Sequence, residues 1–253
     1  MKAEWSVARA FWLCLLWAVA QAAWAAGEAA VVVSLVGTVS AQKPDGKVRV
    51  LAKDSALLPG EVVMTEKGSA VRLRFTDGSQ TTLRPGSRLV IEDFNYDEAD
   101  PARDRKVINL VKGGMRAVTG AVGKRGNQDA YQAKTVAGTI GIRGTDYALL
   151  LCEKVEAGEP GNCSNLDVPD ELQIDGIPAE GLYFAVFEGA ISVTNNVSQT
   201  EFAEGQSGYV KDANSAPLEL PKDPGLAREF PLLGNLPGIL NPFGGVVGAC
   251  LVR

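Results

Sequence analysis

The sequence contains no histidine among its 253 residues. Histidine is the commonest general base and metal ligand, so its absence excludes a Ser-His-Asp triad, a Cys-His pair and a histidine zinc site. Aromatic residues make up only 7% of the chain, whereas glycine accounts for 28 residues. This composition favours short strands and turns over helices.

Long apolar runs are also scarce, because no stretch after the N-terminal region reaches 18 apolar residues. The N-terminal run, residues 10–20, follows Lys2 and Arg9 and precedes small residues that fit an A-x-A cleavage pattern. We therefore predict a signal peptide at 1–25, with an uncleaved anchor as the alternative, and a periplasmic protein with no transmembrane segment after its removal.

The chain has little excess positive charge with which to bind nucleic acid. Its formal net charge is -5 at pH 7, and loss of the signal peptide, which carries Lys2, Arg9 and Glu4, makes this -6. Nucleic-acid binding depends on neutralising phosphates, so no nucleic-acid partner is expected.

Cysteine is rare, and Cys14 would leave with the signal peptide. In an oxidising compartment we expect Cys152 and Cys163 to form a disulfide across a polar loop. Cys250 would then be free or paired between molecules. A zinc site is the weaker alternative, because the three cysteines lack paired C-x-x-C spacing.

Alternating apolar residues predict several strands. Val71, Leu73 and Phe75 alternate with polar residues, and Asp77-Gly78 directly afterwards is a strong hairpin signal. Pro44-Asp45-Gly46 predicts another turn. Between residues 111 and 151, glycines recur so often that we expect short strands and bends.

A glycine cluster lies near the middle of the chain, in TIGIRGTDY and the residue before it. Gly138, Gly141 and Gly144 fall every third residue, which matches neither the dinucleotide fingerprint nor a P-loop, so no cofactor is expected. The alternative is structural: Gly141 and Gly144 at bends, with Arg143 contacting Asp146 or a backbone carbonyl.

The segments LVKGGMRAVTG and YQAKTVAGTIGIRGTDYAL resemble the core of the FecR domain family. Flanking segments extend the resemblance over residues 31–210. It implies an all-β domain outside the cytoplasmic membrane. The namesake members relay an iron-siderophore signal to a sigma factor through a cytoplasmic segment. Here an export signal comes first, so we do not expect that relay.

Together these features predict one glycine-rich all-β domain over 31–210, either a rolled sandwich or a short β-solenoid. Residues 152–180 are expected to form an inserted loop. Residues 211–253 are expected to form an irregular Pro/Gly-rich tail that docks in a groove, touches a membrane or, preferably, binds a protein partner.

The function expected is a non-enzymatic periplasmic binding, scaffold or sensory module that contacts an envelope protein or a cell-wall component. One alternative is a carboxylate-based hydrolase, with candidate acids Asp77, Glu92, Asp93 and Asp146. Another is a remnant of sigma-factor signalling. The acidic loop 93–104 lacks calcium-loop spacing, so no metal is expected.

Overall fold

The computed structural model of the chain describes residues 27–125, 127, 129–154 and 161–230. Strands dominate this part of the chain, which confirms the all-β prediction. The helical segments are single turns: η1 (Pro101–Arg103), η2 (Asp170–Leu172) and α2 (Leu226–Glu229). The predicted signal peptide and residues 231–253 lie outside the described residues.

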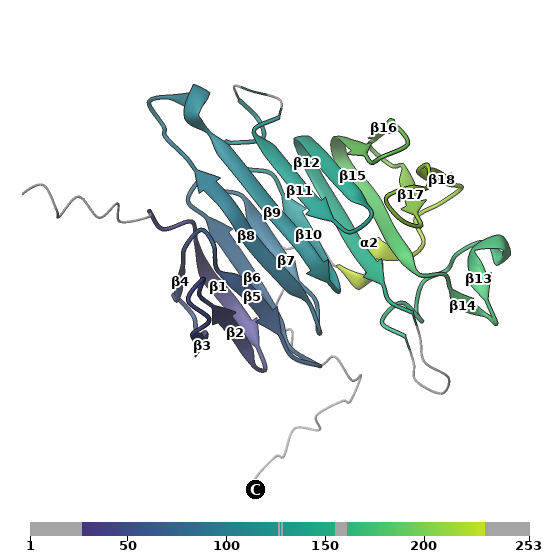
Figure 1. Ribbon diagram of the computed structural model, residues 1–253, viewed down its shortest axis with the longest axis horizontal. Helices are drawn as coiled ribbons and strands as arrows, with labels where there is room; N and C mark the ends of the chain where they lie inside the picture. The colour runs from purple at the N-terminus through teal and green to yellow at the C-terminus, as the bar shows by residue number, and fades with distance from the viewer. Residues whose placement is uncertain (1–26, 126, 128, 155–160, 231–253) are drawn as a thin grey trace, which may run out of the picture.

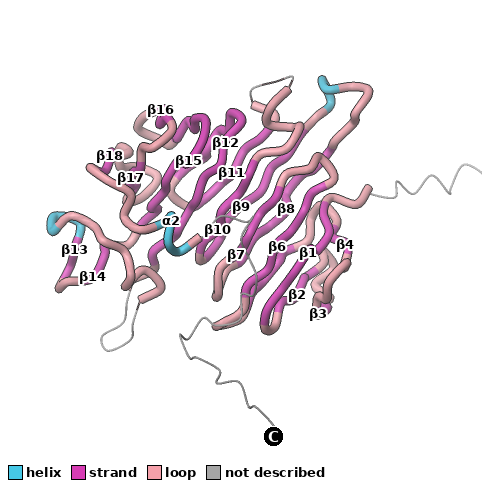
Figure 2. The backbone as a smooth tube through the Cα atoms, turned by 180° about the vertical axis from the view of Figure 1, so that it is seen from behind, coloured by secondary structure: helices cyan, strands magenta, loops and turns pink. Residues whose placement is uncertain are grey.

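The strands form a two-layered sandwich, which Figures 1 and 2 show from opposite sides. The first layer contains, in spatial order, β3 (Val48–Val50), β2 (Val39–Gln42), β5 (Val62–Thr65), β8 (Arg88–Asn95), β9 (Arg105–Lys112), β11 (Tyr131–Thr135), the first half of β12 (Gly138–Cys152), the second half of β15 (Gly181–Thr194) and β16 (Gln199–Ala203).

The second layer contains β4 (Ala56–Leu57), β1 (Ala30–Val36), β6 (Ala70–Phe75), β7 (Gln80–Leu83), β10 (Gly114–Val118), the second half of β12, the first half of β15, β17 (Ser207–Val210) and β18 (Leu218–Leu220). β9 and β11 are parallel, and the other described pairs are antiparallel. A separate hairpin consists of β13 (Gln173–Ile174) and β14 (Ile177–Pro178).

The chain crosses between the layers at a row of turns that we call the turn rim. It comprises residues 37–38, 66–69, 84–87 and 113, which join β1 to β2, β5 to β6, β7 to β8 and β9 to β10. Each of these turns joins a strand of one layer to a strand of the other, so both layers gain strands in step along the chain. This agrees with the predicted rolled sandwich.

Local sequence determines the predicted hairpin between β6 and β7. Asp77 accepts a hydrogen bond at Oδ1 from the Ser79 amide (3.0 Å), and Gly78 has φ +82°. Val71, Leu73 and Phe75 are buried between the layers, as their alternation predicts. The hairpin is therefore fixed by the turn and by the apolar face together.

Two cores stabilise the sandwich. One lies between the layers. The second core covers the outer face of the second layer, where residues 161–180 and 220–230 pack against β12 and β15. Along β12, Leu149 and Leu151 face the first core while Ala148 and Leu150 face the second. Burial on both faces accounts for the unbroken apolar run at this point.

Two segments are more ordered than the sequence predicts. β12 runs for 15 residues, where only short strands were expected, because it bends at Gly144 and continues into the other layer. The predicted tail begins with a packed portion: β18 pairs with β17, and Leu226 and Phe230 are buried in the second core.

The turns of the turn rim stack closely enough to require glycine. Ser87 Oγ accepts a hydrogen bond from the Gly114 amide (3.0 Å), which draws the β9–β10 turn against the β7–β8 turn. Gly113 has φ +75°, and a Cβ atom there would lie 2.7 Å from Ser87 Cα. A side chain at residue 113 would therefore strain the backbone and push two turns apart.

We predict that Gly113→Ala lowers the free energy of unfolding by about 3 kcal/mol, from left-handed strain plus overpacking. Gly46→Ala is the matched control, because Gly46 has φ +84° but a methyl group on its Cα would meet nothing within 4 Å. It should lose about 1 kcal/mol from strain alone. Urea denaturation measures both, and equal losses would contradict the stacking argument.

Candidate functional site

The glycine cluster at residues 138–147, which we call the signature segment, forms a corner at which β12 passes from the first layer to the second. The β12–β15 register shifts between Arg143 and Asp146, and Gly144 between them has φ +62°. Gly189 of β15 has φ +79°, and a Cβ atom on it would lie 2.6 Å from the Gly144 carbonyl oxygen. The two long strands thus turn the same corner in direct contact.

The backbone amides at this corner are already bonded inside the protein. The Gly144 amide donates to the Gly123 carbonyl (3.0 Å), and the Thr145 amide donates to Thr119 Oγ1 (2.9 Å). Thr145 Oγ1 donates to the Ala190 carbonyl (2.6 Å). A phosphate cradle needs amides that point freely at the ligand. The arrangement therefore supports the structural interpretation of the glycines.

The other two signature glycines lie within the strand. A Cβ atom on Gly138 would lie 2.6 Å from the Thr194 carbonyl oxygen, so glycine there allows close approach to β15. Gly141 pairs regularly with Gln132 and Ser192. The prediction that Gly141 sits at a bend is wrong, because the strand bends three residues later.

The predicted contact of Arg143 with Asp146 or a backbone carbonyl is also wrong. Arg143 Nη1 lies 3.0 Å from Glu201 Oε1 on β16, in an exposed ion pair. The corner carries the chain into the other layer between residues 143 and 146. Their side chains therefore belong to different layers.

Asp146 instead forms a buried, bidentate ion pair with Arg116 on β10. Arg116 Nε lies 2.8 Å from Asp146 Oδ1, and Nη2 lies 2.7 Å from Oδ2. Arg116 is opposite Ala148, which places Asp146 diagonally across on the same face of the sheet. The Arg116 side chain is 4% exposed and that of Asp146 is 10% exposed. Because water reaches neither charge well, each is stabilised mainly by the other.

The same guanidinium holds the C-terminal part of the described chain. Arg116 Nη1 donates to the Phe230 carbonyl, and its Cζ lies 4.2 Å from the centroid of the Phe187 ring. Arg116 was not among the residues predicted from the sequence. The available signal was an arginine inside the apolar stretch GGMRAV.

A second buried cation, Lys106 on β9, lies between the layers. Its Nζ donates to Ser79 Oγ (2.7 Å) and lies 3.6 Å from the centroid of the Phe75 ring. Burial lowers the pKa of Lys106 to about 7, although the nearby Asp77 acts in the opposite direction. Lys106 was not predicted from the sequence either, because it is flanked by an exposed, charged loop.

Two tyrosines complete the polar cluster around Lys106. The hydroxyl oxygens of Tyr131 and Tyr147 lie 2.8 Å apart, and both side chains are buried. Burial raises the pKa of both phenols above the ordinary value of 10. Both rings therefore remain neutral far into the alkaline range.

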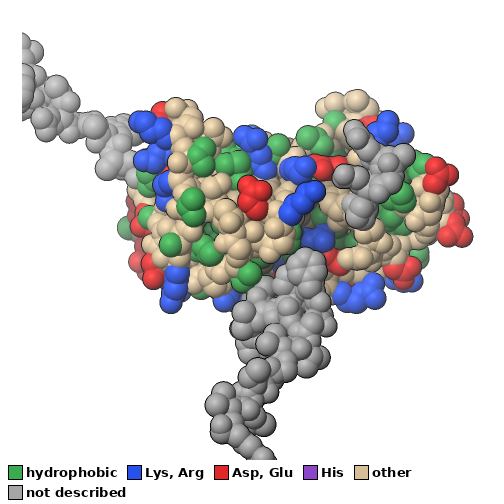
Figure 3. Space-filling model, turned by 90° about the horizontal axis from the view of Figure 1, so that it is seen from below, with side chains coloured by type: hydrophobic (Ala, Val, Ile, Leu, Met, Phe, Trp, Pro, Cys, Tyr) green, Lys and Arg blue, Asp and Glu red, His purple; other side chains and the backbone are tan. Residues whose placement is uncertain are grey.

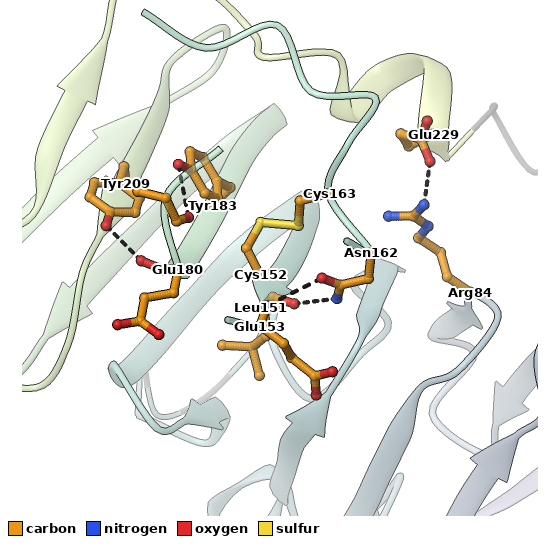
Figure 4. Close-up of a disulfide and its surroundings, with 11 residues drawn as sticks. Arg84, Leu151, Cys152, Glu153, Asn162, Cys163, Glu180, Tyr183, Tyr209 and Glu229 are labelled. Carbon is orange, nitrogen blue, oxygen red and sulfur yellow. Dashed lines mark hydrogen bonds and ion pairs between the residues drawn. A yellow bond between two sulfur atoms is a disulfide. The ribbon is translucent and has the colours of Figure 1, made fainter. Parts of the chain in front are cut away.

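The predicted disulfide between Cys152 and Cys163 is present, with their Cα atoms 5.6 Å apart (Figure 4). It ties the end of β12 to the segment that covers the second core. The Asn162 amide group bridges the same two segments, donating to the Leu151 carbonyl (2.6 Å) and accepting from the Glu153 amide (3.2 Å). Cys250 lies outside the described residues.

The remaining candidate acids are also engaged. Glu92 Oε2 lies 2.7 Å from Lys134 Nζ, and Asp93 Oδ2 lies 2.6 Å from Arg105 Nε. Asp77 accepts from both the amide and the hydroxyl of Ser79. Within the described ranges, no three Cys, Asp or Glu side chains come together in a way that could hold a metal ion.

The protein is a rolled β-sandwich in which the signature segment forms the corner where β12 changes layers. Residues 61–160 match the family described as FecR protein, so the chain contains a FecR domain in this segment. The search of curated proteins found no match. Across residues 27–230, apart from the gaps, no helix is long and apolar enough to cross a membrane.

Solved structures with similar backbones include two of a candidate anti-sigma factor from Parabacteroides distasonis ATCC 8503, each 11% identical with a TM-score of 0.41. Those matches cover 65% of this chain and 61% of the other, which is less than two thirds of its length. A third is a cell surface anchoring domain, 27% identical, with a TM-score of 0.24 and 24% and 82% coverage.

The pKa of Lys106 leads to a pH-dependent stability. Folded Lys106 loses its proton near pH 7, whereas unfolded lysine keeps it to about 10.5, so the unfolded state binds more protons between these values. We expect the free energy of unfolding to rise from pH 7 to 9, with a slope of at most about 1.4 kcal/mol per pH unit. The free energy of unfolding should fall above pH 10, because Tyr131 and Tyr147 lose their protons in the unfolded state before they do in the folded state, where both are buried.

Urea denaturation at each pH tests this expectation. The chain has no histidine to titrate in the same range. Lys106→Met removes the titrating amine and should abolish the rise. A wild-type protein with constant stability from pH 7 to 9, or an unchanged rise in Lys106→Met, would contradict it.

The buried ion pair predicts strong coupling between two substitutions. Arg116→Met or Asp146→Leu alone should lower the free energy of unfolding by about 3–5 kcal/mol, because each leaves a buried charge without its partner. The double variant should recover much of that loss. A double-mutant cycle measured by urea denaturation checks this, and strictly additive losses would mean that the pair is not coupled.

Proposed function

We propose that this FecR-domain protein is a non-enzymatic binding, scaffold or sensory module that acts in the periplasm through contacts with envelope proteins or cell-wall components. The disulfide supports a compartment outside the cytoplasm, because disulfides persist in oxidising environments. The family match supports the type of module.

The observation that carries this proposal is the open edge of the first layer at β3. Among the described strands, β3 pairs with β2 alone. Val48 and Val50 are 59% and 74% exposed, whereas Arg49 between them turns inward to Glu61, with Nη2 2.8 Å from Oε2. An open edge with exposed apolar side chains can accept a strand from a partner.

The hydrolase alternative has less support. A glycosidase needs one carboxylic acid and one carboxylate facing a shared substrate space. Glu92 and Asp93 are each in ion pairs, and Asp146 is buried against Arg116. These acids are therefore used to hold strands together, which favours binding over catalysis.

We also propose that residues 231–253 contact a protein partner. They lie outside the described residues, but the chain leading to them is fixed, because Phe230 is buried and its carbonyl accepts from Arg116. Their sequence is almost uncharged and rich in Leu, Val and Gly. Such a segment gains most from burial against another protein.

Site-specific photocrosslinking in the native cells tests the binding function. We expect a crosslinker at Val50 to capture one defined envelope component, and the added substitution Val48→Lys to reduce its recovery about tenfold by placing a charge in the contact. A crosslinker at Val197, which is 56% exposed on the β15–β16 turn, is the matched control.

Identical capture from both positions would contradict the role of the β3 edge. Hydrolysis of a cell-wall glycan by the purified protein, lost in Glu92→Gln, would instead establish the enzymatic alternative. The two outcomes are distinguishable because the first measures contacts and the second measures turnover.

A further inference from the structure

The turn rim and the strand ends beside it carry four cations. Lys67 precedes the glycine of the β5–β6 turn, Arg84 opens the β7–β8 turn, Lys112 ends β9, and Lys154 follows β12. All four line one groove of about 550 Å³. Figure 3, which looks from below, shows Lys and Arg side chains gathered near the middle of this end of the molecule.

Hydrogen bonds hold the turns at this end of the sandwich side by side. The Gly86 amide donates to the Glu66 carbonyl (3.2 Å), Ser87 Oγ donates to the Gly114 carbonyl (3.0 Å), and the Leu151 amide donates to the Gly113 carbonyl (2.8 Å). Successive turns are therefore neighbours in the sheet, about 4.8 Å apart. The turns that carry Lys67 and Arg84 and the end of β9 that carries Lys112 therefore lie side by side at the groove.

The charges of the groove are only partly neutralised. Lys112 pairs with Glu153 at 2.9 Å, but both side chains are about half exposed, so a ligand can compete for Lys112 at little cost. Arg84 pairs with Glu229 and lies over the Phe230 ring, which fixes it in place. Among the described residues, Lys67 has no acid within ion-pair distance.

This basic groove stands on an acidic protein, whose net charge is -5. Like charges placed close together repel one another, and of these four cations only Arg84 and Lys112 have an acidic partner among the described residues. Ser164 and Asn165 add a hydroxyl and an amide to the same wall. Cations combined with neutral hydrogen-bonding groups suit a ligand that carries both anionic groups and hydroxyls.

We propose that this groove binds an anionic glycan, a chain of sugars that bear a carboxylate or a phosphate on successive residues. Several cations in one groove can pair with more than one anionic group of the same chain. The proposal rests on the proposed binding function and names a ligand class for it. It uses the turn rim, not the β3 edge.

Fluorescence anisotropy with labelled hexagalacturonate and the purified full chain tests the proposal. We expect saturable binding that weakens as salt is raised, because the contacts are exposed ion pairs. Maltohexaose, which has the same length without charge, should not compete. Lys67→Gln/Lys112→Gln should weaken binding about tenfold or more.

Lys43→Gln/Lys47→Gln is the matched control, because it removes the same charge from the exposed β2–β3 turn. It should leave the affinity unchanged, and Lys67→Arg/Lys112→Arg should retain binding. Circular dichroism and urea denaturation verify that every variant is folded. These results together would support the groove as the glycan site.

The proposal is overturned if hexagalacturonate does not bind, if maltohexaose competes equally, or if both lysine pairs lower the affinity alike. Binding to phosphatidylglycerol vesicles without binding to hexagalacturonate would also overturn it, in favour of a membrane surface. In each case, continued crosslinking from Val50 in cells would leave the proposed binding function intact.

Discussion

β12 and β15 belong to both layers of the sandwich, because each turns through a glycine at the same corner. Gly144 and Gly189 lie in contact there, with a backbone spacing that leaves no room for a Cβ atom on Gly189. All later elements depend on this contact. The second half of β12 and the first half of β15 form the sheet surface against which the disulfide-linked segment and the C-terminal part of the described chain pack.

The buried charges make this arrangement specific. A buried ion pair adds little net stability compared with apolar packing, but a wrong register that separates its members is strongly disfavoured. Arg116 and Asp146 meet only when β10 and β12 are correctly aligned and the chain has turned the corner. The Phe230 carbonyl joins the same guanidinium, so the C-terminal segment is fixed by the same residues as the signature.

What could be predicted from the sequence depended on distance along the chain. The Asp77-Gly78 hairpin and the Cys152–Cys163 disulfide are local, and both were predicted correctly. The Arg116–Asp146 pair joins residues 30 positions apart. No local pattern shows that a strand will change layers, so Asp146 was expected to contact its near neighbour Arg143. The open edge at β3 also depends on strand order, which local patterns do not reveal.

Hydrogen exchange tests most directly the claim that the signature is a structural corner. The account predicts that the amides of residues 144–151 exchange only through global unfolding, together with those of 182–186 in β15. Exchange of the exposed loop 95–104 should be orders of magnitude faster. If the amides of Gly144 and Thr145 exchanged as fast as that loop while the rest of β12 stayed protected, the corner would be a mobile loop and the account would be wrong.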